Sequence, residues 1–102
     1  MIREVAEIAV KDGTEAEFVA AVEKAVPIFR AAKGCSAMRL EKVVETPGLF
    51  RLIVLWETLE DHTVTFRGSE GFQAWRGLVG PFFAQPPRVD HSEMAVAGFG
   101  EA

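Results

Sequence analysis

The stretch from Leu49 to Phe83 constrains the fold most, because its hydrophobic residues change period part-way along it. Leu49 to Trp56 is a continuous β-type run, too apolar for a strand that has one face in water. From Leu59 onward the apolar residues follow helical intervals. Both tryptophans and most of the phenylalanines lie in this stretch. A small domain that concentrates so much aromatic mass uses it either to fill its core or to line a pocket.

The first part of the chain predicts one strand and one helix. Residues 1–10 alternate between an oily face and a mixed face, as a half-buried strand does. We expect Thr14 to cap the following helix, with Glu17 completing a capping box. Pro27 lacks an amide proton, so it should kink this helix or thin its last turns. Gly34 is a natural stop for the helix.

A hairpin follows this helix. Pro47 and Gly48 form a strong turn signal between a strand predicted at residues 36–46 and the apolar strand that begins at Leu49. Met38, Leu40 and Val44 are expected on one face of the residue 36–46 strand.

The last third of the chain predicts two helical pieces and a strand. Thr58 can cap the first piece, Gly68 interrupts it, and Ser69 can cap the second. The final strand is expected at residues 89–97, followed by a frayed tail at residues 98–102.

The predicted order is therefore β-α-β-β-α-β, the ferredoxin-like split βαβ arrangement of the α+β class, in one domain of residues 1–102. Two helices would cover one face of a four-stranded antiparallel sheet. The apolar strand is oily on both sides, with Leu49, Ile53 and Leu55 on the side opposite to Trp56. Helices of the same chain can bury only one set, so we expect a homodimer that packs sheet to sheet.

Composition narrows the classes of partner. A net charge of -4 and a pI near 5.1 give no basic surface, so nucleic acid is not an expected partner. No apolar run approaches the ~20 residues that cross a bilayer, so we expect no membrane partner. We expect a cytoplasmic protein. The single cysteine, Cys35, and two widely separated histidines lack the spacing of a chelating motif, so no metal is expected.

The element order resembles the antibiotic biosynthesis monooxygenase (ABM) domain, a family of dimeric α+β barrels. Trp56-Glu57-Thr58 at the end of the third strand, and the helix with Ser69 and Phe72, resemble it too. The similarity covers nearly the whole chain, and its short motifs specify the fold better than the activity. It implies several roles: cofactor-free oxygenation of polycyclic phenols, oxidation of quinol-like molecules, haem degradation, or no known reaction.

The residues disfavour haem degradation. Haem-degrading relatives use an asparagine on the first strand, and this chain contains none. Aligning on Ser69 and Phe72 puts Phe66 at the tryptophan position of those relatives and Arg76 at the position of their axial histidine. An arginine cannot serve as the usual neutral imidazole ligand. We therefore expect no cofactor.

Two histidines are the candidates for proton transfer. His62 could take a proton from a phenol, because an imidazole titrates near neutral pH. Alternatively, His62 is a solvated or hydrogen-bonded surface group early in its helix. His91, at the start of the last strand, could face the ligand, or it could pair with a neighbouring carboxylate.

An aromatic wall is the candidate ligand site. Trp56, Phe66, Phe72 and Trp75 could line a flat apolar pocket for a small aromatic ligand, or they could be plain core. Arg76 could hold an anionic phenolate or carboxylate, or form a surface salt bridge.

Two functional hypotheses follow. The leading one is a cofactor-independent monooxygenase acting on a small electron-rich aromatic of the phenol or quinol type, with His62 handling protons. The alternative is a non-catalytic small-molecule-binding or interaction domain on the same dimeric barrel. An enzyme needs a titratable group that faces the ligand, whereas a binding domain needs only shape and apolar area.

Overall fold

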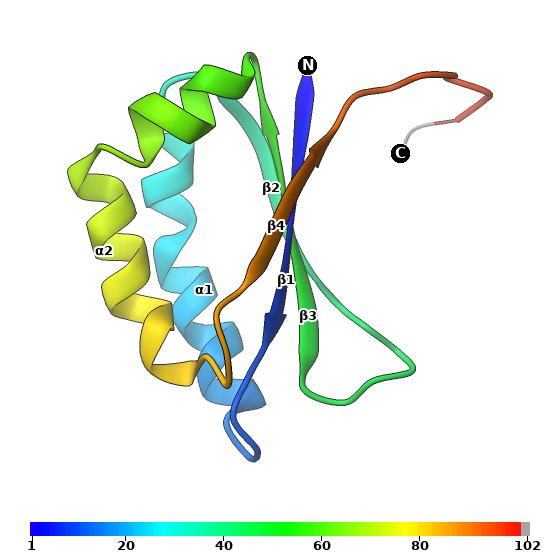
Figure 1. Ribbon diagram of the computed structural model, residues 1–102. Helices are drawn as coiled ribbons and strands as arrows, with labels where there is room; N and C mark the ends of the chain where they lie inside the picture. Colours follow the sequence, from blue (N-terminus) through cyan, green and yellow to red (C-terminus); the bar gives the residue numbers. More distant parts are fainter. Residues whose placement is uncertain (101–102) are drawn as a thin grey trace.

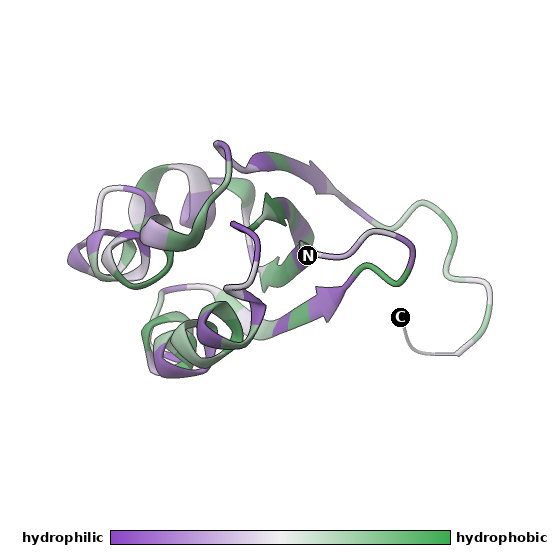
Figure 2. Ribbon diagram, turned by 90° about the horizontal axis from the view of Figure 1, so that it is seen from below, coloured by the Kyte–Doolittle hydropathy of each residue, from purple (hydrophilic) through white to green (hydrophobic). Residues whose placement is uncertain are grey.

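The chain folds in the predicted β-α-β-β-α-β order in a computed structural model that describes residues 1–100 (Figure 1). The sheet is antiparallel, with strand order β2-β3-β1-β4. Both long helices lie on one side of it, and no helix covers the other side (Figure 2). This is the ferredoxin-like α+β fold, with an open sheet. The elements are β1 (Ile2–Ala9), α1 (Glu15–Arg30), β2 (Cys35–Lys42), β3 (Leu49–Trp56), η1 (Asp61–Phe66), α2 (Glu70–Val79), η2 (Gly80–Phe82) and β4 (Arg88–Ser92).

The core lies between the sheet and the helices. One set of β3 side chains points toward the helices and is fully buried, as the period-two pattern predicts. The stripe of α1 residues at helical spacing is buried against it. Aromatic rings join the layers: the ring of Phe18 on α1 packs against that of Phe50 on β3 with centroids 5.0 Å apart. The buried residues of these two stripes are Phe50, Leu52, Val54 and Trp56 on β3, and Phe18, Val22, Ala25 and Phe29 on α1.

The start of α1 differs from the prediction. Thr14 precedes the helix, but its side chain makes no cap hydrogen bond. Instead its hydroxyl donates to the Lys11 carbonyl at 2.6 Å, so it serves the preceding turn and the capping box is wrong. At the other end α1 ends at Arg30, one turn after Pro27 and before Gly34.

Two strands are shorter than predicted. β2 ends at Lys42, and Val44 is 88% exposed. β4 ends at Ser92 because its register pairs Ser92 with Arg3, close to the start of β1. Beyond this point β1 has almost no backbone left to pair with, and the chain leaves the sheet (Figure 1). Of the expected tail, residues 101–102 lie outside the described part of the chain.

The second helical region begins with a π-helical turn that contains His62. Thr58 accepts a hydrogen bond from the Asp61 amide at 3.1 Å, and η1 then continues as a π-helix. The Arg67 amide bonds to the carbonyl of His62, five residues back. Short π-helical turns of this kind are frequent at functional sites. Ser69 begins α2 as predicted, its hydroxyl accepting from the Phe72 amide at 3.2 Å.

Among residues 1–100, no helix is both long and apolar enough to cross a bilayer.

Candidate functional site

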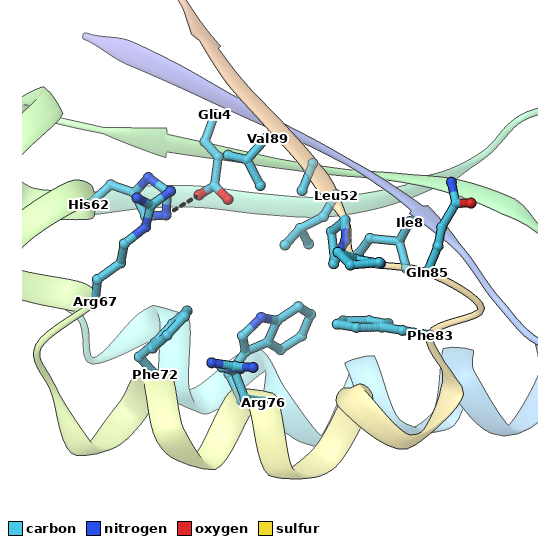
Figure 3. A pocket seen from close by; sticks show the side chains of 14 residues that line it. Glu4, Ile8, Leu52, His62, Arg67, Phe72, Arg76, Phe83, Gln85 and Val89 are labelled. Atoms are coloured by element: carbon cyan, nitrogen blue, oxygen red, sulfur yellow. Dashed lines mark ion pairs between the residues drawn. The ribbon is translucent and has the colours of Figure 1, made fainter.

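A cavity of about 530 Å³ opens between the sheet and the second helical region (Figure 3). Strand side chains form one apolar wall, and aromatic side chains of α2 and the following turn form the opposite wall. A few polar groups interrupt this lining, as in many small-molecule sites. The apolar lining is Ala6, Ile8, Leu52, Phe72, Trp75, Phe83, Pro86, Pro87 and Val89, and the polar lining is Glu4, His62, Arg67, Arg76 and Gln85.

A buried carboxylate lies at one end of this cavity. Glu4 on β1 is only 5% exposed, and its Oε1 accepts a hydrogen bond from Trp56 Nε1 at 2.9 Å. The same oxygen lies 3.3 Å from His62 Nε2. Burial raises the pKa of Glu4 to about 6, although the Trp56 hydrogen bond and the charge of Arg67 act in the opposite direction.

His62 connects this carboxylate to a second histidine. Its Nδ1 is hydrogen-bonded to His91 Nε2 at 2.8 Å. The imidazole is 3% exposed and stacks on Trp56, with ring centroids 5.2 Å apart. Burial, together with the charges of Arg67 and His91, lowers the pKa of His62 to about 4. His62 is therefore a neutral imidazole at pH 7.

Strand register and the π-helix bring these groups together. Glu4 lies directly opposite His91 in the β1–β4 pair, so both side chains point to the helix side of the sheet. Trp56 lies opposite Ile2, two residues from Glu4 on the neighbouring strand. His62 then enters from η1, where it is buried together with Asp61 and Phe66.

Two arginines lie at the cavity wall. Arg67 follows η1, and its positive charge lowers the pKa of Glu4, His62 and His91. Arg76 on α2 lies with its Cζ 5.9 Å from the ring centroid of Phe72, within cation–π range. Arg67 and Arg76 are both exposed residues. In the free protein their charges are therefore solvated, and they can still reach a ligand in the cavity.

The structure divides the predicted site residues into three groups. His62, Phe72, Trp75 and Arg76 line the cavity. Trp56 and Phe66 lie behind its wall, as 0% and 5% exposed core residues with ring centroids 5.2 Å apart. His91 contacts the site through His62.

Three sequence-based interpretations need correction. His62 is not a solvated surface group, because strands far away in sequence bury it. His91 pairs with His62 rather than with a carboxylate. Glu4 and Arg67 were missed. The signal for Glu4 was its place in the oily set of the first strand, where Ile2, Ala6 and Ile8 are its companions.

Among residues 1–100, no group of three or more histidine, cysteine, aspartate or glutamate side chains is placed to hold a metal ion.

Comparison with known proteins identifies the family. The sequence profile described as antibiotic biosynthesis monooxygenase (ABM) matches residues 1–78, most of the chain. The chain belongs to this family. The match ends before β4, so His91 lies outside it while Glu4 and His62 lie within it.

Three individual proteins show what the chain is similar to. A crystal structure from Bordetella bronchiseptica, of a protein assigned to the antibiotic biosynthesis monooxygenases, shares 45% identity with a TM-score of 0.91, and covers 93% of this chain and 97% of its own. A Bacillus subtilis protein, Uncharacterized protein YczJ, is 43% identical over 91 residues, which cover 89% of this chain and 96% of the relative. A Caulobacter crescentus structure at 20% identity has a TM-score of 0.80, covers 93% of this chain and 90% of its own, and shows likeness of fold alone.

Proposed function

We propose that this ABM-family protein is a cofactor-independent monooxygenase acting on a small electron-rich aromatic of the phenol or quinol type. The observation that carries the proposal is a titratable cluster of Glu4, His62 and His91 at the wall of an otherwise apolar cavity. Apolar walls accept an aromatic ring, and the cluster supplies a proton acceptor close to neutral pH. A purely structural pocket has no need of a buried carboxylate.

The reaction needs no electrons beyond those of the substrate. In a phenol whose carbon opposite the oxygen carries a hydrogen, deprotonation gives a phenolate, and its electron pair can form a bond from that carbon to O₂. The O–O bond of the resulting peroxide then breaks. One oxygen atom becomes the second carbonyl of a quinone, and the other leaves as water with the phenolic hydrogen and the ring hydrogen. The substrate is thereby oxidised by four electrons, and O₂ is reduced by four.

The cavity walls supply the binding groups for such a substrate. Phe72 and Trp75 face the apolar strand residues Ile8 and Leu52, so a flat ring fits between two apolar surfaces. Arg76 and Arg67 favour an anion and therefore the phenolate over the phenol. Trp56 and Phe66 support the wall from behind, and His91 holds His62.

We also propose that the protein is a homodimer through packing of the open sheet faces. Leu49 and Leu55 lie half-buried on the face without helices, and Ile53 lies between them. Arg3, on the same face of β1, has a buried Nε without a hydrogen-bond partner within residues 1–100. A second copy would cover the apolar side chains and offer acceptors to this guanidinium.

Oxygen uptake by the metal-free protein tests the proposed reaction. A panel of hydroquinones, anthrols and related phenols is compared with the no-protein rate, and His62→Ala is run beside the wild type. Uptake by the wild type that falls in the variant supports the monooxygenase. Binding of these compounds without any uptake would instead indicate the non-catalytic binding domain.

A further inference from the structure

We infer that Glu4 is the group that takes the proton from the substrate, and that His62 and His91 position its carboxylate rather than act as the base. This inference rests on the proposed function. The base is then not His62, which the sequence suggested, but Glu4, whose free oxygen is seen only in the folded arrangement.

The two oxygens of Glu4 have different surroundings. Oε1 receives the Trp56 hydrogen bond and contacts His62 Nε2. Within residues 1–100, no hydrogen bond is formed by Oε2. The carboxyl group points from β1 toward the cavity, whose wall it helps to form (Figure 3). Glu4 therefore has free lone pairs on the ligand side, held in place by contacts on the other oxygen.

His62 lacks such a free lone pair. Its Nε2 faces Glu4 Oε1 and its Nδ1 is hydrogen-bonded to His91 Nε2. An ionised carboxylate can only accept, so the His62 proton belongs on Nε2. The lone pair of Nδ1 then accepts from His91, whose Nε2 carries its own proton. The lone pair of Nδ1 is thus occupied by His91, and Nε2 carries a proton 3.3 Å from Glu4 Oε1, so the imidazole has no free lone pair that could take a proton from a substrate.

The proton steps balance with Glu4 as the only shuttle. Glu4 Oε2 takes the phenolic proton, and the electron pair of the O–H bond stays on the substrate. After O₂ has added to the opposite ring carbon, Glu4 returns this proton to the outer peroxide oxygen, forming a hydroperoxide. Glu4 then removes the ring proton at the oxygenated carbon as the C=O bond forms and the O–O bond breaks. The departing hydroxide takes this proton from Glu4 and leaves as water.

Glu4→Gln is the decisive variant, because the amide oxygen can still accept from Trp56 and lie against His62 while the group cannot take a proton. Glu23→Gln, at an exposed position of α1 outside the cavity lining and away from the open sheet face, is the matched control. With a panel compound that the wild type oxygenates, we expect Glu4→Gln to lower kcat at least about 100-fold, a typical contribution of a general base. The dissociation constant of the unreactive methyl ether should change less than about threefold in Glu4→Gln, and Glu23→Gln should match the wild type.

A pH profile separates the base from its positioning residue. The charged and titratable groups around Glu4 are His62 on η1, Arg67 after it, His91 on β4 and Cys35 on β2. We expect the wild-type rate to rise through a single acidic limb. His62→Gln should move this limb and lower kcat by about tenfold, because the glutamine amide can replace the Nε2 donor. Retained activity in Glu4→Gln, with loss of activity in His62→Gln, would overturn the inference while the proposed function stands.

If no panel compound is oxygenated, the proposed function is contradicted. The role of Glu4 can still be tested by a measurement that needs no turnover. The side-chain ¹³C resonance of Glu4 is titrated with a phenol bound and with the corresponding methyl ether bound. A phenolic O–H that reaches Oε2 should lower the pKa of Glu4, because a donor favours the ionised carboxylate. The ether has no proton to donate and should not. Equal titrations with the two ligands would overturn the role of Glu4.

Discussion

Glu4 and His91 lie directly opposite each other on neighbouring strands, yet the carboxylate reaches the histidine only through the imidazole of His62. The β1–β4 register places both side chains on the helix side of the sheet. The π-helix η1 then inserts His62 between them. A shift of β4 by one residue would turn His91 to the open face and leave His62 Nδ1 without its partner.

The pKa of Glu4 predicts how stability depends on pH. The folded-state pKa is raised from 4.5 to about 6, so the favourable contribution of the protonated group is fully present below pH 4.5 and is lost as the pH rises through 6. The glutamine of Glu4→Gln cannot ionise, so the variant does not lose this contribution. We expect the free energy of unfolding of the wild type, compared with that of the variant, to fall by about 2 kcal/mol between pH 4 and pH 8, as the rise of the pKa from 4.5 to about 6 implies. Urea denaturation at both pH values measures it, and a difference independent of pH would contradict it.

His62 has the opposite sign. Its folded-state pKa is lowered from 6.5 to about 4, so its contribution to stability is present above pH 6.5 and is lost as the pH falls through 4. His62→Gln cannot ionise. We expect the drop in the free energy of unfolding between pH 7 and pH 4 to be smaller in the variant by about 2–3 kcal/mol. Parallel pH profiles for the two proteins would show that His62 is not desolvated in the native state.

Gly34 should be irreplaceable, because it holds the segment that presents His62. It has a φ of +78°, and a Cβ there would collide with the Asp61 side chain, one residue before His62. We expect Gly34→Ala to lower the free energy of unfolding by more than about 2 kcal/mol, since strain and collision add. Gly77→Ala is the matched control, because nothing lies within 4 Å of its added Cβ and the position is helical. The control should be neutral or stabilising by up to about 1 kcal/mol in thermal denaturation.

Local signals were enough to predict the fold. The apolar run at residues 49–56, the helical stripe that begins at Phe18 and the turn at Pro47-Gly48 are each read from neighbouring residues. Together they fix the element order, and the order fixes the ferredoxin-like topology. The end of β4 was not predictable in this way, because it depends on where its partner β1 begins.

The candidate site depended on contacts that sequence spacing does not reveal. The partners of His62 are Glu4 and His91, which lie on β1 and β4, far from it along the chain. Helical spacing around His62 could not have revealed them, since a π-helix breaks the 3.6-residue period of an α-helix. Glu4 was visible as a charge on an oily strand face, but the free Oε2 is a property of the folded arrangement.

The open face of the sheet predicts the effect of a charge at Leu55. In a sheet-to-sheet dimer this side chain would lie against the second copy, so Leu55→Glu should convert dimers to monomers by burying an unpaired carboxylate. Val64→Glu is the control, because Val64 is 66% exposed on η1, away from that face. Analytical ultracentrifugation at several concentrations measures both. A wild-type protein that sediments as a monomer at every concentration would reject the dimer.

Arg67 predicts a preference for ionised ligands. Its charge already acts on Glu4, His62 and His91, so an anion bound in the same cavity should gain from it. We expect Arg67→Gln to weaken binding of a naphtholate about tenfold and binding of the neutral methyl ether by less than about twofold, so the anion should lose about 1.0–1.4 kcal/mol more than the ether. Raising the salt concentration should narrow the gap in the wild type, because Arg67 is exposed. Arg30→Gln is the control, since Arg30 is exposed in the last turn of α1 and does not line the cavity. Isothermal titration calorimetry of the wild type and the two variants measures these dissociation constants. Equal losses of affinity for the anion and the ether in Arg67→Gln would mean that Arg67 contributes shape rather than charge.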